Sequence, residues 1–190
     1  MSDIDKTAIP TKFLWVDLEM TGLDPAQDLI LEVAAEVTDM NLKTLESYES
    51  RVFQEKAAVA TRMQANTWWR DFPQNRDDFL DHLSQGKPQA QVVKDLIALV
   101  DRHFGTEPAV LAGNSIHNDR AFIKTQWPSL DIKLHYRMLD VSSFKVLMQG
   151  RYGVIFEKQQ PHRAFDDIQA SIAELQHYID YFNSHGSQDS

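Results

Sequence analysis

The chain has 190 residues, and we expect a single domain over 1–190 with flexible tails at 1–12 and 184–190. It contains no cysteine, which excludes disulfides, thiolate metal sites and thiol nucleophiles and leaves oxygen and imidazole as metal ligands. A formal net charge of −9 argues against a surface that binds long duplexes, because that requires clustered Lys and Arg.

Two features concern the compartment. The first twelve residues are mixed polar and lack the apolar core of a signal peptide. No stretch approaches the ~20 consecutive apolar residues of a membrane span. We therefore expect a soluble, cytoplasmic protein with no membrane partner.

The first part of the chain is predicted to form an antiparallel meander of strands. Its first strand is apolar and ends in Asp17 and Glu19, which alternation places on the same face. A turn at residues 20–25 follows. The predicted strands are 13–19, 29–38 and 45–53.

The middle of the chain is predicted to be mainly helical. Apolar residues at helical spacing indicate a helix that includes 92–104. A short apolar strand then ends at Gly113, and we expect Pro128 to end the helix that follows. The remaining predicted elements are short helices at 63–69 and 79–83, the strand 109–112 and the helix 119–126.

The last part begins with a strand at 139–141, and Ser142 is placed to cap a helix at 143–149. Residues 150–162 are predicted to be a mobile loop. A final helix at 163–183 has one apolar face. Strands first, then strands alternating with helices, favour an α/β fold with a mixed sheet flanked by helices.

Four carboxylates and one histidine form the candidate site: Asp17, Glu19, Asp119, His162 and Asp167. Hydrolysis of a phosphodiester needs an activated water, relief of phosphoryl charge and support for the leaving oxygen, and two hard cations can supply all three. Mg²⁺ and Mn²⁺ prefer oxygen ligands, so carboxylates are the expected donors. A histidine can accept a proton from the water.

Each of these residues also has an ordinary reading. Acids at a strand end, such as Asp17 and Glu19, are usually solvated, and Asp119 can be an acid in the first turn of a helix. A surface histidine is common, and the chain has 7. His162 stands five residues before Asp167, which could bring both towards one cleft.

Four segments carry a resemblance to a known family. They are Trp15-Val-Asp17-Leu-Glu19-Met-Thr-Gly-Leu23-Asp-Pro25, Gly113-Asn-Ser115-Ile-His-Asn-Asp119-Arg120, His135-Tyr-Arg137-Met-Leu-Asp140-Val-Ser142 and His162-Arg-Ala-Phe-Asp166-Asp167. In order and spacing the chain resembles the oligoribonucleases, in the histidine-containing branch of the DEDD group of 3′-to-5′ exonucleases.

The resemblance implies a ribonuclease H-like fold, a homodimer, and short RNA oligonucleotides, chiefly dinucleotides, as substrates. It implies that two Mg²⁺ or Mn²⁺ ions are bound by Asp17, Glu19, Asp119 and Asp167, with His162 as the general base. Asp166 competes with Asp167, which is preferred for its spacing from His162.

The resemblance also assigns substrate contacts. It makes Leu23 an apolar wedge at a base, and it makes an aromatic of the middle segment a stacking surface. Trp68 is the better match for that aromatic and Trp69 is nearly as good, because the family's Trp-Asn and Thr-His pattern is altered here; both can also be packing residues. The remaining assigned contacts are Ser115, Arg137 and Ser142 around the terminal phosphate and Tyr136 reaching the neighbouring subunit.

Two rival functions remain open. One is a related exonuclease that acts on longer single-stranded DNA or RNA 3′ ends, or that trims transfer RNA. The other is a non-catalytic oligonucleotide-binding module that has kept the fold. The presence of all five site residues argues against the second.

Overall fold

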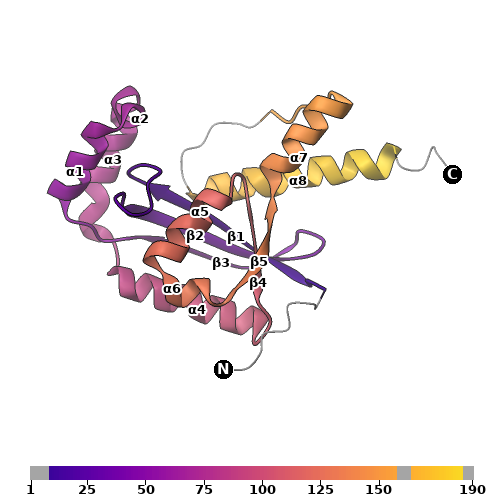
Figure 1. The fold of residues 1–190 in the computed structure, drawn as a ribbon, viewed down its shortest axis with the longest axis horizontal. Helices are drawn as coiled ribbons and strands as arrows, with labels where there is room; N and C mark the ends of the chain where they lie inside the picture. The colour runs from indigo at the N-terminus through magenta and orange to yellow at the C-terminus, as the bar shows by residue number, and fades with distance from the viewer. Residues whose placement is uncertain (1–8, 158–163, 186–190) are drawn as a thin grey trace.

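In the computed structural model, which describes residues 9–157 and 164–185, five strands form one mixed sheet with the order β3-β2-β1-β4-β5 (Figure 1). The first three strands pair antiparallel, while β1 with β4 and β4 with β5 pair parallel. The meander and the α/β class are therefore confirmed. The strands are β1 (Lys12–Met20), β2 (Ile30–Asp39), β3 (Thr44–Arg51), β4 (Ala109–Gly113) and β5 (Leu134–Asp140).

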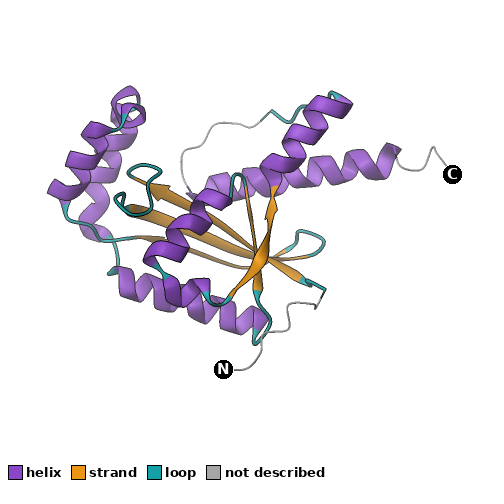
Figure 2. Cartoon of the chain, in the orientation of Figure 1, coloured by secondary structure: helices purple, strands orange, loops and turns teal. Residues whose placement is uncertain are grey.

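Helices flank this sheet on both faces (Figure 2). A single turn of 3₁₀-helix at Leu83–Gln85 and a π-helical turn at Met148–Tyr152 extend two of them. The α-helices are α1 (Lys56–Ala65), α2 (Thr67–Asp71), α3 (Pro73–His82), α4 (Gln89–Phe104), α5 (His117–Gln126), α6 (Pro128–Asp131), α7 (Val141–Leu147) and α8 (Ala164–His185).

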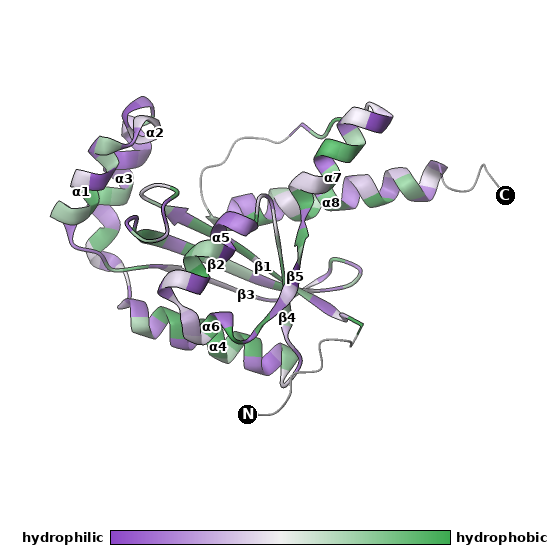
Figure 3. Cartoon of the chain, viewed as in Figure 1, coloured by the Kyte–Doolittle hydropathy of each residue, from purple (hydrophilic) through white to green (hydrophobic). Residues whose placement is uncertain are grey.

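The alternation of side chains along β1 divides the core between two layers of helices. Leu14, Val16 and Leu18 face the layer of α4, α5 and α6. Trp15 faces the opposite layer, where it packs with residues of α7 and α8. The central strands are mainly hydrophobic along their length (Figure 3), as expected for strands covered on both faces. Asp17 and Glu19 follow Trp15 at intervals of two, so they belong to the α8 side.

A smaller apolar cluster lies at one end of the sheet, away from α7 (Figure 1). It joins Leu31 of β2 to buried side chains of α1, α2 and α3. The sequence predicted one helix over 63–69, but the chain breaks at Asn66, which has extended backbone angles. Its side chain accepts a hydrogen bond from the backbone N–H of Trp68 at 2.9 Å and so caps α2.

Of two other expectations about helix ends, one is wrong and one is confirmed. Ser142 does not cap the helix after β5; Asp140 does, because its carboxylate accepts the backbone N–H of Ser142 at 2.9 Å. The helix predicted over 119–126 does end at Gln126, before Pro128. That proline then opens α6, since a fixed proline φ suits the first turn of a helix.

The segment boundaries near the C-terminus differ from the prediction. The strand expected at 139–141 begins at Leu134, and the loop expected at 150–162 starts with a π-helical turn; residues 158–163 lie outside the described part of the chain. The tails expected at 1–12 and 184–190 also fall mostly outside it, although β1 includes Lys12 and α8 runs to His185. Among the described helices, none has both the length and the hydropathy of a membrane span.

Candidate active site

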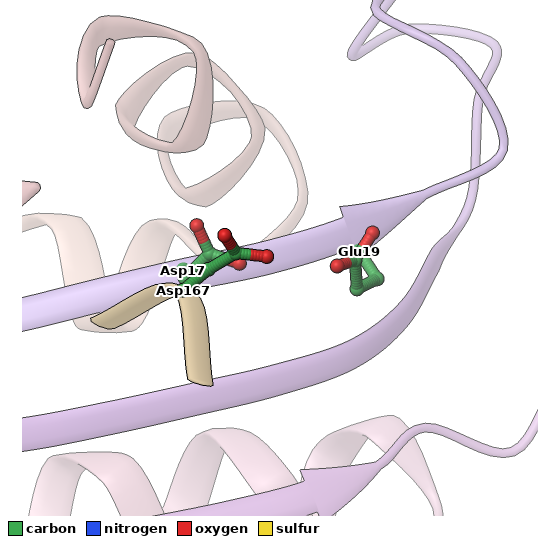
Figure 4. Close-up of side chains that lie close together, drawn as sticks. All are labelled: Asp17, Glu19 and Asp167. Carbon is green, nitrogen blue, oxygen red and sulfur yellow. The ribbon is translucent and has the colours of Figure 1, made fainter. Parts of the chain in front are cut away.

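Three carboxylates from two distant parts of the chain meet on the α8 side of the sheet. Asp17 and Glu19 belong to β1, and Asp167 belongs to the first turn of α8 (Figure 4). One oxygen of each lies within 4.8 Å of those of the other two, and all three residues are half-buried. We refer to Asp17, Glu19 and Asp167 as the carboxylate trio. The competitor Asp166 is exposed.

Asp119 approaches the same strand from another helix. It lies in the first turn of α5 and is buried, and its Oδ1 accepts the backbone N–H of Leu18 at 2.9 Å. Leu18 stands between the two acids of β1, so Asp119 adjoins the carboxylate trio without belonging to it. Burial, with a smaller contribution from the charge of Asp140, raises the pKa of Asp119 to about 7, against the lowering effect of hydrogen bonds from the backbone N–H groups of Leu18 and of Asp119 itself.

This donor set fits a divalent cation. Carboxylate oxygens are the ligands that Mg²⁺ and Mn²⁺ prefer, and the spacing within the carboxylate trio allows its oxygens to share one ion. A cation would also favour the charged form of Asp119, which burial disfavours in its absence. His162, the predicted general base, lies outside the described residues.

A pocket of about 340 Å³ opens beside Glu19. One wall is the end of β1 and the turn after it, and the other is formed where α1 meets α2. Leu23 lines this pocket while remaining 72% exposed. The lining residues are Leu18, Glu19, Met20, Gly22, Leu23, Asn66, Trp68 and Trp69.

The two adjacent tryptophans occupy different environments. Trp69 is 2% exposed, packs edge-on against Phe79, and donates its indole N–H to the carbonyl of Thr21 at 3.0 Å. Trp68 is half-buried and lies across Trp69, with 4.6 Å between ring centroids. Trp69 is therefore fixed by packing and a buried hydrogen bond, and Trp68 is the more accessible ring at the pocket.

The turn that carries Leu23 is held by contacts that the sequence analysis missed. Asp28 accepts hydrogen bonds from the Thr21 hydroxyl and from the backbone N–H of Asp24. Gln126 of α5 donates to the carbonyls of Pro25 and Asp28. A Cβ on Gly22 would come within 2.5 Å of the Asp28 carboxylate, so a larger residue here would push that carboxylate away from its present position.

Ser115 and Ser142, which we call the serine pair, meet at the carboxyl ends of β4 and β5. Their hydroxyl oxygens are 3.1 Å apart, and the backbone N–H of Ser115 contacts Ser142 Oγ at 2.9 Å. The same N–H reaches Asp140 Oδ1 at 3.0 Å. Ser115 has a φ of 51°, a left-handed conformation that non-glycine residues rarely adopt.

Tyr136 and Arg137 lie farther back on the edge strand β5, and both are exposed. The Arg137 guanidinium lies over the Tyr136 ring at 5.2 Å from its centroid, and Tyr136 stacks on buried His135. The backbone N–H of Arg137 donates to His135 Nδ1 at 3.0 Å. In the described part of the chain these two residues contact each other and His135 rather than the serine pair.

Comparison with known proteins identifies the family. The exonuclease family model RNase_T matches residues 14–175. The oligoribonuclease of Corynebacterium glutamicum is 42% identical over 176 residues, which cover 88% of this chain and 78% of that protein. The oligoribonuclease of Pseudomonas fluorescens is 35% identical over 177 residues, which cover 91% and 97%. A probable oligoribonuclease of Caenorhabditis elegans is 36% identical over 176 residues, covering 90% and 88%.

Solved structures agree on the fold. A product-bound exonuclease I matches with a TM-score of 0.57 at 15% identity, over 92% of this chain and 46% of that one. Exonuclease I of E. coli bound to a 5cy-dA13 oligonucleotide gives a TM-score of 0.58 at 16% identity, over 93% and 43%. The chain thus spans less than half of these structures, and the predicted ribonuclease H-like fold is confirmed. The chain therefore belongs to the exonuclease family and, within it, to the oligoribonucleases, which are 3′-to-5′ exoribonucleases.

Proposed function

We propose that this enzyme removes 5′-mononucleotides from the 3′ ends of very short RNA oligonucleotides, chiefly dinucleotides. The observation that carries the proposal is the carboxylate trio beside a pocket of about 340 Å³. A pocket of this volume suits a small ligand. The net charge of −9 also favours short substrates, because a long strand needs an extended cationic track.

In this proposal Asp17, Glu19, Asp119 and Asp167 hold two Mg²⁺ or Mn²⁺ ions. Such ions supply charge neutralisation at the phosphoryl group and make a water a better nucleophile. The protein's part is to hold four carboxylates in place from β1, α5 and α8. The hydrogen bond from Leu18 fixes Asp119 against the strand that carries Asp17 and Glu19.

We assign His162 the role of proton acceptor from the attacking water. The assignment rests on its sequence position, five residues before Asp167, and on the imidazole pKa, which ordinarily lies near neutrality. An imidazole that accepts this proton returns it to solvent or to the leaving oxygen as the mononucleotide departs.

We propose substrate contacts at two places: a base at the pocket and a phosphate at the serine pair. Leu23 and Trp68 line the pocket and would enclose a base between an apolar side chain and a ring. The serine pair, with Arg137, would bind a phosphate at the 5′ end, where a guanidinium offers paired donors. If these residues enclose the 5′ phosphate, they leave no room for a further nucleotide, and longer RNA chains are excluded.

The homodimer is part of the same proposal. Tyr136 and Met138 are exposed on the edge strand β5, and exposed apolar side chains of this kind favour contact with another subunit. Tyr136 would reach the site of that subunit.

The test is a length and sugar series: RNA and DNA of two, five and twenty nucleotides, assayed with Mg²⁺ and with EDTA. We expect metal-dependent release of 5′-mononucleotides, fastest on the RNA dinucleotide. A flat dependence on length, or equal rates on DNA, would favour an exonuclease for longer 3′ ends. Binding without hydrolysis at any length would favour the non-catalytic module.

A further inference from the structure

Glu174 of α8 is a buried carboxylate outside the proposed cation site. It is 0% exposed and accepts the Tyr178 hydroxyl at 2.7 Å and the Asn114 amide at 3.1 Å. Lys145 of α7 lies 3.3 Å from its Oε1. A carboxylate removed from water is costly unless its oxygens are paired, and these three donors pair both of them.

The contact with Glu174 fixes which way the Asn114 side chain points. Asn114 Nδ2 lies 2.9 Å from Ser171 Oγ as well as 3.1 Å from Glu174 Oε2. The Ser171 hydroxyl donates its proton to the carbonyl of Asp167, so it accepts from Asn114. With acceptors on both sides, only the amide nitrogen of Asn114 can face α8, and its carbonyl oxygen must face the other way.

The carbonyl oxygen of Asn114 determines the direction in which the hydroxyl of Ser142 donates its proton. Ser142 Oγ lies 3.1 Å from Asn114 Oδ1, which can only accept, so the hydroxyl proton of Ser142 is directed there. Ser142 Oγ then receives the backbone N–H of Ser115 with a lone pair. In the contact between the two hydroxyls, the remaining proton belongs to Ser115.

We propose that Glu174 is a positioning residue: acting through Asn114, it makes Ser115 the hydroxyl of the serine pair that donates to a terminal phosphate. The inference rests on the proposed function, because it takes a 5′-phosphate as the ligand of the serine pair. Without a ligand, the one hydroxyl proton of Ser115 points to Ser142 Oγ; in the complex it turns to the phosphate, while the Ser115 backbone N–H keeps its contact with Ser142. Ser142 cannot compete as a donor, because its own proton is directed to Asn114 Oδ1. The left-handed backbone of Ser115, with a φ of 51°, is held by the contacts of its N–H to Ser142 and Asp140.

The test uses Glu174→Gln, which keeps the shape of the side chain. Tyr178 donates to Oε1 and the Lys145 ammonium lies 3.3 Å from it, so the glutamine oxygen stays on their side and its NH₂ faces Asn114. Two amide donors cannot pair, and Asn114 must turn its own NH₂ towards Ser142. The Ser142 proton is then released and becomes a second donor for a phosphate.

The measured quantity is the phosphate preference, defined as kcat/KM for a 5′-phosphorylated dinucleotide divided by kcat/KM for its 5′-hydroxyl form. In the otherwise unchanged enzyme, Ser115→Ala should lower this preference about tenfold, as expected when one hydrogen bond to a charged group is lost. In the Glu174→Gln background, the same Ser115 change should cost much less. Asn114→Ala, which removes the acceptor of the Ser142 proton, should reproduce that coupling if Glu174→Gln does not fold.

The matched control is Glu36→Gln, the same substitution at another buried glutamate, one that bonds Thr44 and Gln169. In that background Ser115→Ala should cost the same factor as in the unchanged enzyme. The proposal would be overturned if Ser115→Ala lowered the phosphate preference by the same factor in the Glu174→Gln background as in the unchanged enzyme. It would also be overturned if the phosphate preference depended on Ser142 alone. Hydrolysis of both dinucleotides without any phosphate preference would also overturn it and leave the proposed function standing, whereas absence of hydrolysis would refute the proposed function itself.

Discussion

At the scale of single residues, Asp119 combines a structural cost with a proposed functional role. It is buried, hydrogen bonds from backbone N–H groups only partly offset that burial, and its pKa is raised to about 7 from an ordinary value of 3.8. Because the pKa of this carboxyl is higher in the folded state, the free energy of unfolding is highest below pH 3.8 and falls as the pH rises from there through 7, where the buried group becomes charged. Without a cation, the charged form at pH 8 costs at most roughly 4 kcal/mol.

We therefore predict that the metal-free enzyme melts at a lower temperature at pH 8 than at pH 5.5. Asp119→Asn should remove much of that difference, because an amide carries no charge to bury. The measurement is thermal unfolding in EDTA at both pH values. Asp166→Asn, at an exposed position, is the control and should keep the full difference; an Asp119→Asn profile like that of the unchanged protein would contradict the account.

At the scale of elements, the N-cap of the short helix α2 determines the environments of the two tryptophans that follow it. The cap at Asn66 turns the chain so that Trp69 points into the cluster with Phe79 while Trp68 stays at the pocket. The same Asn66 side chain donates to the carbonyl of Thr21, which Trp69 also contacts. The end of β1 and the start of α2 are thereby fixed to each other.

The two tryptophans should respond differently to removal. Trp68→Ala should raise KM for the dinucleotide about tenfold or more, because a stacked base contributes ~1–3 kcal/mol, and should change the melting temperature little. Trp69→Ala should lower the free energy of unfolding by about 3–5 kcal/mol, because it empties a packed site and leaves the Thr21 carbonyl without its indole donor. Kinetics and denaturant unfolding on both variants separate the roles, and a reversal of the two effects would exclude Trp68 as the stacking surface.

The bodies of strands and helices that have a clear apolar pattern could be predicted from the sequence. The residues that begin and end some helices could not. The continuous apolar run of β2 predicts a buried strand, and the apolar residues at helical spacing in α4 predict a helix. Both elements are present in the structure. Asn66 and Ser142 each have two possible local roles, and a hydrogen-bond partner decides between them. For Ser142, Asp140 is two residues earlier and caps more effectively because its carboxylate is charged.

At the scale of the whole molecule, topology brings together residues that the sequence separates. β1 is the central strand because it pairs antiparallel with β2 and parallel with β4. Helix α8 packs on the face of β1 on which Asp17 and Glu19 lie, so that Asp167 joins them (Figure 4). Residue type was enough to nominate these acids. It could not reveal Glu174, because a glutamate on an amphipathic helix gives no sign that its carboxylate is buried and bonded to Asn114.

The most direct test of the central claim compares hydrolysis of a 5′-phosphorylated RNA dinucleotide by the unchanged enzyme and by Asp167→Asn, in Mg²⁺. Asp167 is the member of the carboxylate trio that only the fold brings to β1. We predict metal-dependent hydrolysis by the unchanged enzyme and a loss of at least about a hundredfold in Asp167→Asn, with a melting temperature near that of the unchanged protein. An Asp167→Asn variant that cleaves the dinucleotide at the full rate would contradict the account.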